Sequence, residues 1–352
     1  MYIIKKLSPL KNSLLKKYRL KQYTKKAHGI WQDVIERTGR EVVTKKVMEE
    51  IKEYSNEMFS SPSLWPWLAL YTEIKGEFIP GWLPNDYFQI HLLDEWNPRQ
   101  FAEISDMKSF YHDQFAEFTV DPLIMKVSGN YYDSQWSVLT EDQVMELLVS
   151  YGKEIIIKKD GGISGKGIRI IMPDNLKIKT LNDYEENIVI QPIVKQQEIL
   201  SGIHHQSLNT LRIATFIGND GIAVLKFIIL KFGIADCRLS NLNTGGGMAF
   251  LNIDGTVISD IIDGIGIVIG QKHPDSNITL KGLKVPSVKE AVEKCIAHHN
   301  KFPYTRFIAW DIYVDQNSKP KLIEWNAIRP GMWVAEAHVG PLWNLDSILN
   351  GR

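Results

Sequence analysis

The spacing of apolar residues along the chain changes near residue 153. Before that point apolar positions recur every three or four residues, as in "VTKKVMEEIKEYSNEMF" (43–59), "DMKSFYHDQFAEF" (106–118) and "TEDQVMELLVSYG" (140–152), which predicts helices. The last of these starts with Thr140 and Gln143, which can form a capping box, and ends at Gly152. Residues 61–100 are rich in aromatic residues and proline and are expected to form an irregular packed segment.

After residue 153 short apolar runs alternate with glycine-rich or polar turns, which predicts strands with helices between them. Hairpins are expected around Asn219-Asp220-Gly221, at Asp254-Gly255, and between "RFIAWDIYVD" (306–315) and "PKLIEWN" (320–326). This pattern indicates an α+β or a mixed α/β fold, and we expect the α+β class. We divide the chain into a mainly helical N-terminal region (1–104), a small lobe (105–200) and a large lobe (201–352).

Composition excludes several classes of protein. The chain has 352 residues, 44% of them hydrophobic and 23% charged, with a formal net charge of zero, which suits a globular protein and excludes a general polyanion binder. The cysteines, Cys237 and Cys295, have no CxxC spacing, so neither a disulfide scaffold nor a cysteine-rich zinc site is expected. Because we find no signal peptide and no long apolar run, we expect a cytoplasmic location.

Charge is concentrated at one end. Residues 1–26 carry nine Lys or Arg and no Asp or Glu, and Leu7, Leu10, Leu14 and Leu15 lie among them at helical spacing. Such a helix can lie on an anionic membrane or dock on an assembly partner. It can equally pack on its own protein with a solvated basic face, and the residues alone leave both readings open.

The last hairpin carries the clearest chemistry. Antiparallel strands of this length set Asp311 and Glu324 side by side, and Asn326 shares a face with Glu324 because strand side chains alternate. Two carboxylates and an amide oxygen suit magnesium that also holds phosphates. The alternative is a hairpin whose acidic residues face water, but Trp310 and Trp325 suggest buried surroundings.

Two glycine-rich loops are candidates for phosphate binding. "GGISGKG" (161–167) follows a strand that ends near Lys158, and glycines let backbone N–H groups approach phosphate oxygens. It is not a GxxxxGK[ST] motif, and a plain flexible hairpin fits the residues as well. "DCRLSNLNTGGG" (236–247) offers Arg238 and Asn241 with backbone donors for a transferring phosphoryl group, or is simply an exposed loop. The pairs His204-His205 and His298-His299 could suggest metal ligands, but adjacent side chains point in different directions, so one metal ion rarely binds both. We therefore interpret these histidines as structural or solvent-facing.

These segments, in this order, resemble the ATP-grasp superfamily from about residue 105 to 335. "SLNTLRI", "HPDSN…LKGLKVPS" and "AWDIY…EWN" are similar, more narrowly, to the sugar-transfer-associated ATP-grasp family, whose members are linked to bacterial surface polysaccharide synthesis. The resemblance implies an ATP-grasp fold, with two α+β lobes that clamp ATP, and implies ATP and Mg²⁺ as cofactors.

The resemblance also implies roles for single residues. Lys108 and Lys158 would contact phosphates, with Lys159 as the alternative to Lys158. "NIVIQPIVKQQEIL" (187–200) would be the adenine hinge, with Gln191 and Val194 framing the base through backbone groups and Glu198 on the ribose. The complete set is Lys108, Lys158, Gly162, Ser164, Gly165, Gly167, Gln191, Pro192, Ile193, Val194 and Glu198 for ATP, Arg212, Arg238 and Asn241 for catalysis, and Asp311, Glu324 and Asn326 for the metal. Leu239 interrupts the family pattern beside Arg238, so the register of that loop stays open.

The implied activity is ATP-dependent ligation of a carboxylate to an amine through an acyl phosphate. The partners would be small-molecule carboxylates and amines, sugars or amino acids, and not nucleic acid. One alternative is an ATP-dependent kinase that uses the same site on a hydroxyl group. The other is a nucleotide-binding module without catalysis, tethered to a polysaccharide assembly through its basic N-terminus.

Overall fold

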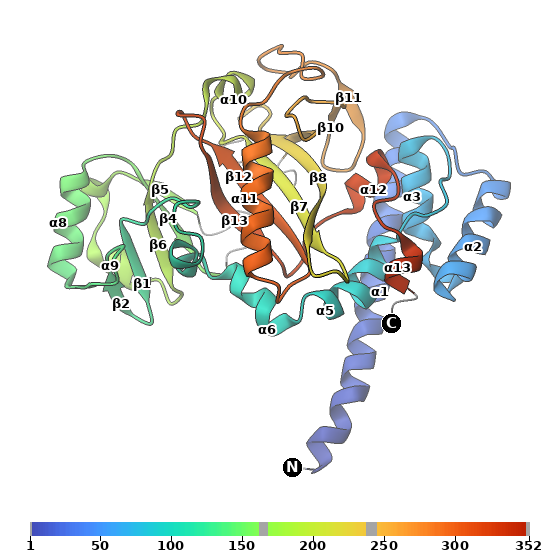
Figure 1. Ribbon diagram of the computed structural model, residues 1–352, viewed down its shortest axis with the longest axis horizontal. Helices are drawn as coiled ribbons and strands as arrows, with labels where there is room; N and C mark the ends of the chain where they lie inside the picture. Colours follow the sequence, from blue (N-terminus) through green and yellow to red (C-terminus); the bar gives the residue numbers. More distant parts are fainter. Residues whose placement is uncertain (1, 162–167, 237–244, 350–352) are drawn as a thin grey trace. The chain divides into compact units, whose positions relative to one another are not determined.

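A computed structural model describes residues 2–161, 168–236 and 245–349, and over 2–13 it describes the backbone alone (Figure 1). The chain forms two compact units. One contains Met1–Pro98, Ile265–Val268 and Gly331–Arg352, and the other contains Arg99–Gly264 and Ile269–Pro330. The N-terminal unit thus takes in two later segments that our division assigned to the large lobe, and that three-part division stays a prediction.

The N-terminal unit is mainly helical, as expected. Its helices are α1 (Tyr2–Thr38), α2 (Lys45–Phe59), α3 (Trp65–Lys75), α4 (Asn85–Tyr87), α5 (Leu93–Trp96), α12 (Trp333–Val339) and α13 (Leu345–Leu349), with a single π-helical turn at Phe88–Leu92. The expectation of an irregular segment over 61–100 was wrong for α3. That helix is buried on nearly all sides, with Trp67 and Tyr71 at 0% exposure, so its sequence has no polar face to reveal a helical period.

The second unit contains two sheets, and the first has six strands in the order β3-β2-β1-β6-β4-β5, with every neighbouring pair antiparallel. Its strands are β1 (Ile124–Val127), β2 (Asn130–Tyr132), β3 (Val138–Leu139), β4 (Ile155–Lys159), β5 (Arg169–Ile171) and β6 (Ile188–Pro192). Helices α8 (Glu141–Tyr151) and α9 (Ile178–Asn182) belong to the same part of the chain (Figure 1). The predicted capping box of Thr140 and Gln143 and the stop at Gly152 are confirmed.

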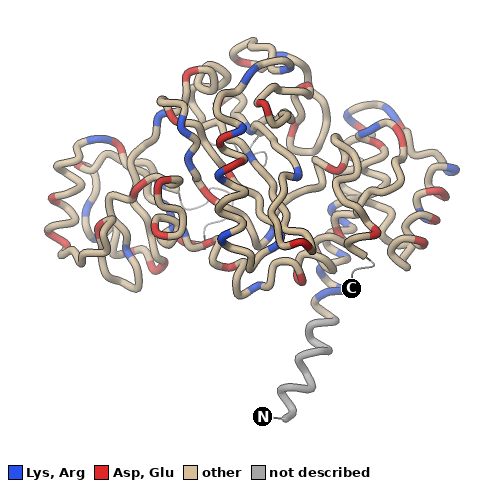
Figure 2. Tube along the Cα trace, in the orientation of Figure 1, with Lys and Arg blue, Asp and Glu red and all other residues tan. Residues whose placement is uncertain are grey.

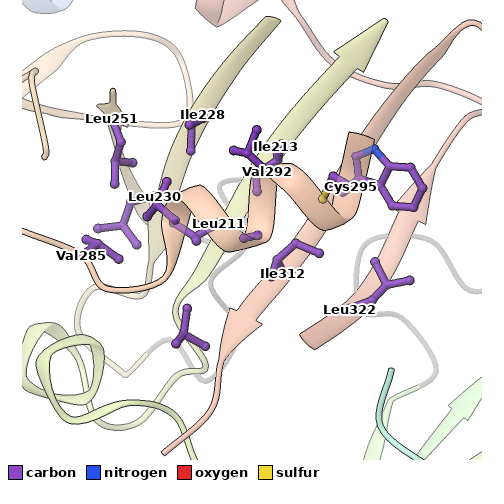
Figure 3. Close-up of a cluster of buried hydrophobic side chains, with 14 of the residues drawn as sticks. Leu211, Ile213, Ile228, Leu230, Leu251, Val285, Val292, Cys295, Ile312 and Leu322 are labelled. Carbon is purple, nitrogen blue, oxygen red and sulfur yellow. The ribbon is translucent and has the colours of Figure 1, made fainter. Parts of the chain in front are cut away.

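The other sheet has seven strands in the order β11-β10-β9-β8-β7-β12-β13. They are β7 (Thr210–Ile217), β8 (Ala223–Phe232), β9 (Gly247–Leu251), β10 (Ile261–Ile262), β11 (Val268–Gly270), β12 (Phe307–Val314) and β13 (Pro320–Asn326). Helix α11 (Val288–Lys301) packs on this sheet, and Figure 3 shows its Val292 and Cys295 among Leu211, Ile213 and Ile312. Helix α10 (Glu198–Ile203) follows the connection from the six-stranded sheet.

The chain before β1 connects the two sheets. The predicted helix over 106–118 is wrong in extent, because the structure has short helical turns at Arg99–Ala102 (α6), Lys108–Phe110 and Tyr111–Gln114 (α7) and a left-handed residue at Glu117. Beyond them the backbone of Phe118 accepts a hydrogen bond from Leu322 of β13 at 2.6 Å, and Leu123 donates to Ile190 of β6 at 2.8 Å. This connector therefore contacts both sheets. Within the described residues, no helix contains an apolar stretch that could cross a membrane.

Candidate active site

Strands β12 and β13 bring together the residues predicted to hold a metal. Asp311 lies opposite Glu324 in the antiparallel register, and a bulge follows directly after this pair. The Nδ2 atom of Asn326 lies 3.4 Å from Oδ2 of Asp311 and 3.3 Å from the carbonyl oxygen of Ala309. The hairpin thus gathers two carboxylates and one amide, as the alternation of strand side chains predicts.

Two cations from other strands of the same sheet contact Asp311, whose exposure is 2%. Arg212 of β7 lies opposite it and donates from Nε to Oδ1 at 3.0 Å and from Nη2 to Oδ2 at 2.7 Å. Lys231 of β8 adds an ion pair from Nζ to Oδ1 at 2.8 Å. Lys231 is not among the residues predicted from the sequence, although a lysine inside the apolar run "IAVLKFIILKF" (222–232) was the available signal.

This arrangement shifts the pKa values of the two carboxylates in opposite directions. Burial acts to raise the pKa of Asp311, but the positive charges of Arg212 and Lys231 hold it well below its usual range. The pKa of Glu324 is raised, first by burial and then by the negative charge of Asp311. Asp311 is therefore ionised, whereas Glu324 is the member of the pair that lacks full compensation.

These residues fit a divalent cation. Among the described residues no three His, Cys, Asp or Glu side chains cluster as metal ligands, so an ion here would rely on Asp311, Glu324 and the amide of Asn326. Its positive charge would relieve the repulsion that raises the pKa of Glu324. An amide can present its oxygen as well as its nitrogen, and the resulting hard oxygen donors suit Mg²⁺.

A recess lies between β13 and the six-stranded sheet in the second unit. Two lysines face it, and Lys158 donates to Oε1 of Gln191 at 2.9 Å. Gln191 in turn donates to the carbonyl of Val120 at 2.6 Å, so its side chain positions Lys158. The lining consists of Lys108, Tyr111, His112, Thr119, Val120, Pro122, Lys158, Val189, Gln191, Leu322 and Ile323.

Charge links this recess to the metal-ligand hairpin. Burial lowers the pKa of Lys158 to about 8, helped by the positive charge of Lys108 and opposed by the negative charge of Glu324. Lys108 in turn acts to lower the pKa of Glu324. Lysines from one side of the recess thus act on a carboxylate of the other sheet.

Hydrogen bonds fix Lys108 near the end of β4. The carboxylate of Asp160, directly after β4, accepts from the backbone N of Ser109 at 3.0 Å and from its hydroxyl at 2.6 Å. The N–H of Gly161 donates to the carbonyl of Asp106 at 2.9 Å. The turn that carries Lys108 is therefore attached to the start of the first glycine-rich loop.

The structure distinguishes Lys158 from Lys159. Lys158 lines the recess, whereas Lys159 pairs with Glu186 at 2.9 Å and lies over the ring of Tyr184. This placement favours Lys158 as the phosphate-contacting lysine.

The other ATP-site predictions are placed less centrally. The described lining of the recess includes Gln191 but not Pro192, Ile193, Val194 or Glu198, which follow on the way into α10, where Glu198 is exposed. Gln191 contributes its side chain here, whereas we expected its backbone to act. Some predicted residues lie outside the described part of the chain, namely Gly162, Ser164, Gly165, Gly167, Arg238 and Asn241.

The histidines of the two pairs have partners within the fold. His204 lies 2.8 Å from the hydroxyl of Ser207, and His299 lies 2.7 Å from that of Thr215. His298 stacks on Phe118, and His205 is exposed. These contacts agree with a structural or solvent-facing role.

Residues 87–341 match the family described as sugar-transfer associated ATP-grasp. The chain belongs to that family. Together with its helical unit and its two antiparallel sheets, this assignment confirms the predicted α+β ATP-grasp fold.

Solved structures similar to this ATP-grasp protein are distant. The biotin carboxylase of Campylobacter jejuni in complex with beta-gamma-ATP has 11% identity and a TM-score of 0.42, and the match covers 70% of this chain and 46% of that chain. The D-alanine–D-alanine ligase of Coxiella burnetii has 12% identity and a TM-score of 0.40, covering 71% and 56%. The matches thus span about half the length of these enzymes. The comparison with curated proteins gave no match.

Proposed function

We propose that this ATP-grasp protein is an ATP-dependent carboxylate–amine ligase that acts through an acyl phosphate. The observation that carries the proposal is the pairing of Asp311 with Glu324 beside Asn326, on the hairpin whose Leu322 and Ile323 line a recess together with Lys108 and Lys158. Binding a nucleotide alone does not require this complete set of oxygen ligands.

The proposed chemistry has two steps. A carboxylate oxygen of the substrate attacks the γ-phosphorus of ATP, the bond to the bridging oxygen breaks, and ADP leaves. The amine nitrogen of the second substrate then attacks the acyl carbon, phosphate leaves, and the amine loses a proton as the amide forms. Such transfers depend on positioning and on neutralising charge, and require no protein nucleophile.

The residues of this chain divide these tasks. Lys108 and Lys158 would bind phosphate oxygens, and Arg212 would hold Asp311 ionised and correctly oriented. Mg²⁺ on Asp311, Glu324 and Asn326 would neutralise phosphate charge. Arg238 and Asn241, proposed from sequence to contact the transferring group, complete the set.

The substrates proposed are small molecules. Membership of the sugar-transfer associated family supports a carboxyl sugar or an amino acid as the acyl donor and a sugar or amino-acid amine as the acceptor, in bacterial surface polysaccharide synthesis. We propose a cytoplasmic site of action, where ATP is available, and retain the division into a helical region and two ATP-grasp lobes.

The test is release of ADP and phosphate from MgATP by the purified protein with a panel of amino acids and uronic sugars. The site variant is Glu324→Gln, which removes one metal-binding charge. Its matched control is Glu293→Gln, which changes an exposed glutamate of α11. A ligase releases ADP and phosphate in equal amounts with one panel member, unchanged by Glu293→Gln and abolished by Glu324→Gln. ADP without phosphate would indicate a kinase, and ATP binding without turnover across the panel would favour the non-catalytic module.

A further inference from the structure

We propose that the first half of helix α1 is a membrane-surface anchor that binds anionic lipid headgroups. This surface is distant in sequence from the candidate active site, and its role does not depend on the proposed ligase activity. Residues 14–18 are all exposed, and five consecutive residues span more than one helical turn. No described residue therefore covers any face of this turn.

The exposed turn carries an apolar patch. Leu14, Leu15 and Tyr18 are 63%, 54% and 62% exposed. At 3.6 residues per turn they fall within an arc of about 100°. In the sequence, Leu7 and Leu10 precede Leu14 by seven and four residues, which is the spacing of one helical face.

The second half of α1 packs on the opposite side of the helix. Ala27 and Val34 are buried at 0% and 1% exposure in the core of the N-terminal unit. Their helical positions are centred roughly 160° away from the apolar patch. The packed part of the helix begins near Arg19, whose guanidinium donates hydrogen bonds to the carboxylate of Asp94 and to the backbone carbonyl of Gln89. The patch therefore cannot be the continuation of the face that α1 packs on its own unit.

The charge of this segment indicates what binds the apolar patch. The segment 1–26 has nine Lys or Arg and no acidic residue, whereas the rest of the chain has an excess of acidic residues. Lys16, Lys17, Lys21 and Lys25 are exposed along this stretch, where Figure 2 shows basic residues following one another along the helix. At 3.6 residues per turn, Lys17, Lys21 and Lys25 fall within about 110° of the centre of the apolar patch, whereas Lys16 lies on the opposite side of the helix. An apolar face flanked by lysines matches an anionic bilayer surface, where the apolar face enters the headgroup region and the lysines meet phosphate.

The experiment is cosedimentation of the full chain with vesicles. One set contains phosphatidylcholine alone, and the other contains equal parts of phosphatidylcholine and phosphatidylserine. We expect binding to the anionic vesicles only, weakened by salt because screening shortens the reach of the lysine charges. The combined variant Leu14→Ser, Leu15→Ser, Tyr18→Ser should lower the partition coefficient at least about tenfold, from loss of the buried apolar area. Lys21→Gln with Lys25→Gln should lower it about 30-fold, from loss of two charges near the membrane surface.

Matched controls separate this surface from general effects. Val138→Ser with Ile222→Ser changes apolar residues that are 71% and 57% exposed elsewhere, and Lys45→Gln with Lys46→Gln changes exposed lysines of α2. Both controls should bind vesicles as the parent does, and every variant should keep the parent thermal midpoint, because the changed side chains are exposed.

Several results would overturn the proposal. These are equal binding to both vesicle types, absence of binding to either, and anionic binding that the Leu14, Leu15 and Tyr18 changes leave intact. A dimer in sedimentation analysis that these changes dissociate, without vesicle binding, would assign the patch to a second copy of the chain and would also refute the lipid anchor. None of these results bears on ATP turnover, so a failure here leaves the ligase test unaffected.

Discussion

The pKa of Lys158 yields a prediction about ATP binding. Burial, with the charge of Lys108, lowers this pKa from 10.5 to about 8 despite the attraction of Glu324. A pKa near 8 lets the ammonium lose its proton within an accessible pH range. If Lys158 binds a phosphate oxygen, the affinity for ATP must fall as that proton is lost.

The magnitude follows from the fraction of protein that carries the proton. With a pKa of about 8, about nine-tenths of Lys158 is protonated at pH 7 and about one-tenth at pH 9. Bound phosphates stabilise the ammonium, so ATP selects the protonated form and raises the pKa in the complex. The affinity is therefore full below pH 7 and declines above it, by about tenfold between pH 7 and pH 9.

Isothermal titration of MgATP at pH 7, 8 and 9 measures this decline. Lys158→Met should bind roughly 10- to 100-fold more weakly at pH 7, which corresponds to the loss of one charge-assisted hydrogen bond, and should show no decline with pH. Lys158→Arg is the matched control, because a guanidinium keeps its proton throughout this range and its affinity should stay level. An affinity of the parent that is level from pH 7 to 9, or the same decline in Lys158→Met, would refute the assignment of Lys158 to phosphate.

Three further predictions concern the metal hairpin and the large sheet. Glu324→Gln should abolish ADP release while leaving the far-ultraviolet circular dichroism spectrum unchanged, since the amide keeps the shape and loses a metal-binding charge; turnover at the parent rate would exclude a metal role. Arg212→Met should lower the free energy of unfolding by about 3 kcal/mol in urea titrations, because it removes one partner of the buried Asp311 carboxylate; a loss below about 1 kcal/mol would show that Lys231 compensates the carboxylate alone. Gly255→Ala should cost about 2 kcal/mol or more in the same assay, since Gly255 has φ +88° and a Cβ atom there would lie 2.3 Å from the carbonyl oxygen of Val285; an unchanged midpoint would contradict the turn geometry.

The sequence was most informative where local periodicity and local chemistry act together. Thr140 and Gln143 cap α8 as expected, because a capping box involves only residues three apart. Asp311 and Glu324 pair as expected, because a short hairpin connects their strands and limits the possible registers. In both cases the partners lie close together in the chain.

Contacts between distant segments were not predictable in the same way. Lys231 contacts Asp311 because β7 is the one strand between β8 and β12, so that the lysine side chain reaches across it. Strand patterns in the sequence do not specify this order of strands. The side chain of Gln191 binds Lys158 across β6 and β4, and a pattern of alternating apolar residues does not report which polar side chain takes that role. Helix α3 escaped prediction for a related reason, since complete burial removes the polar face by which a helix is recognised.

Strand order also explains why the two carboxylates of the hairpin differ. β12 lies inside the sheet, so Asp311 receives cations from β7 and β8, which hold it ionised. β13 is the last strand of that sheet, and Glu324 is compensated first by Lys231 of β8 and then, across the recess, by Lys108 of the connector. Part of the charge balance of Glu324 therefore depends on this connector staying close to β13. A divalent cation that stabilises ionised Glu324, and phosphates that contact Lys108 and keep Lys158 protonated, would each favour the arrangement in which all of these groups meet. On this reasoning nucleotide and metal should bind cooperatively, each strengthening the other through the same recess.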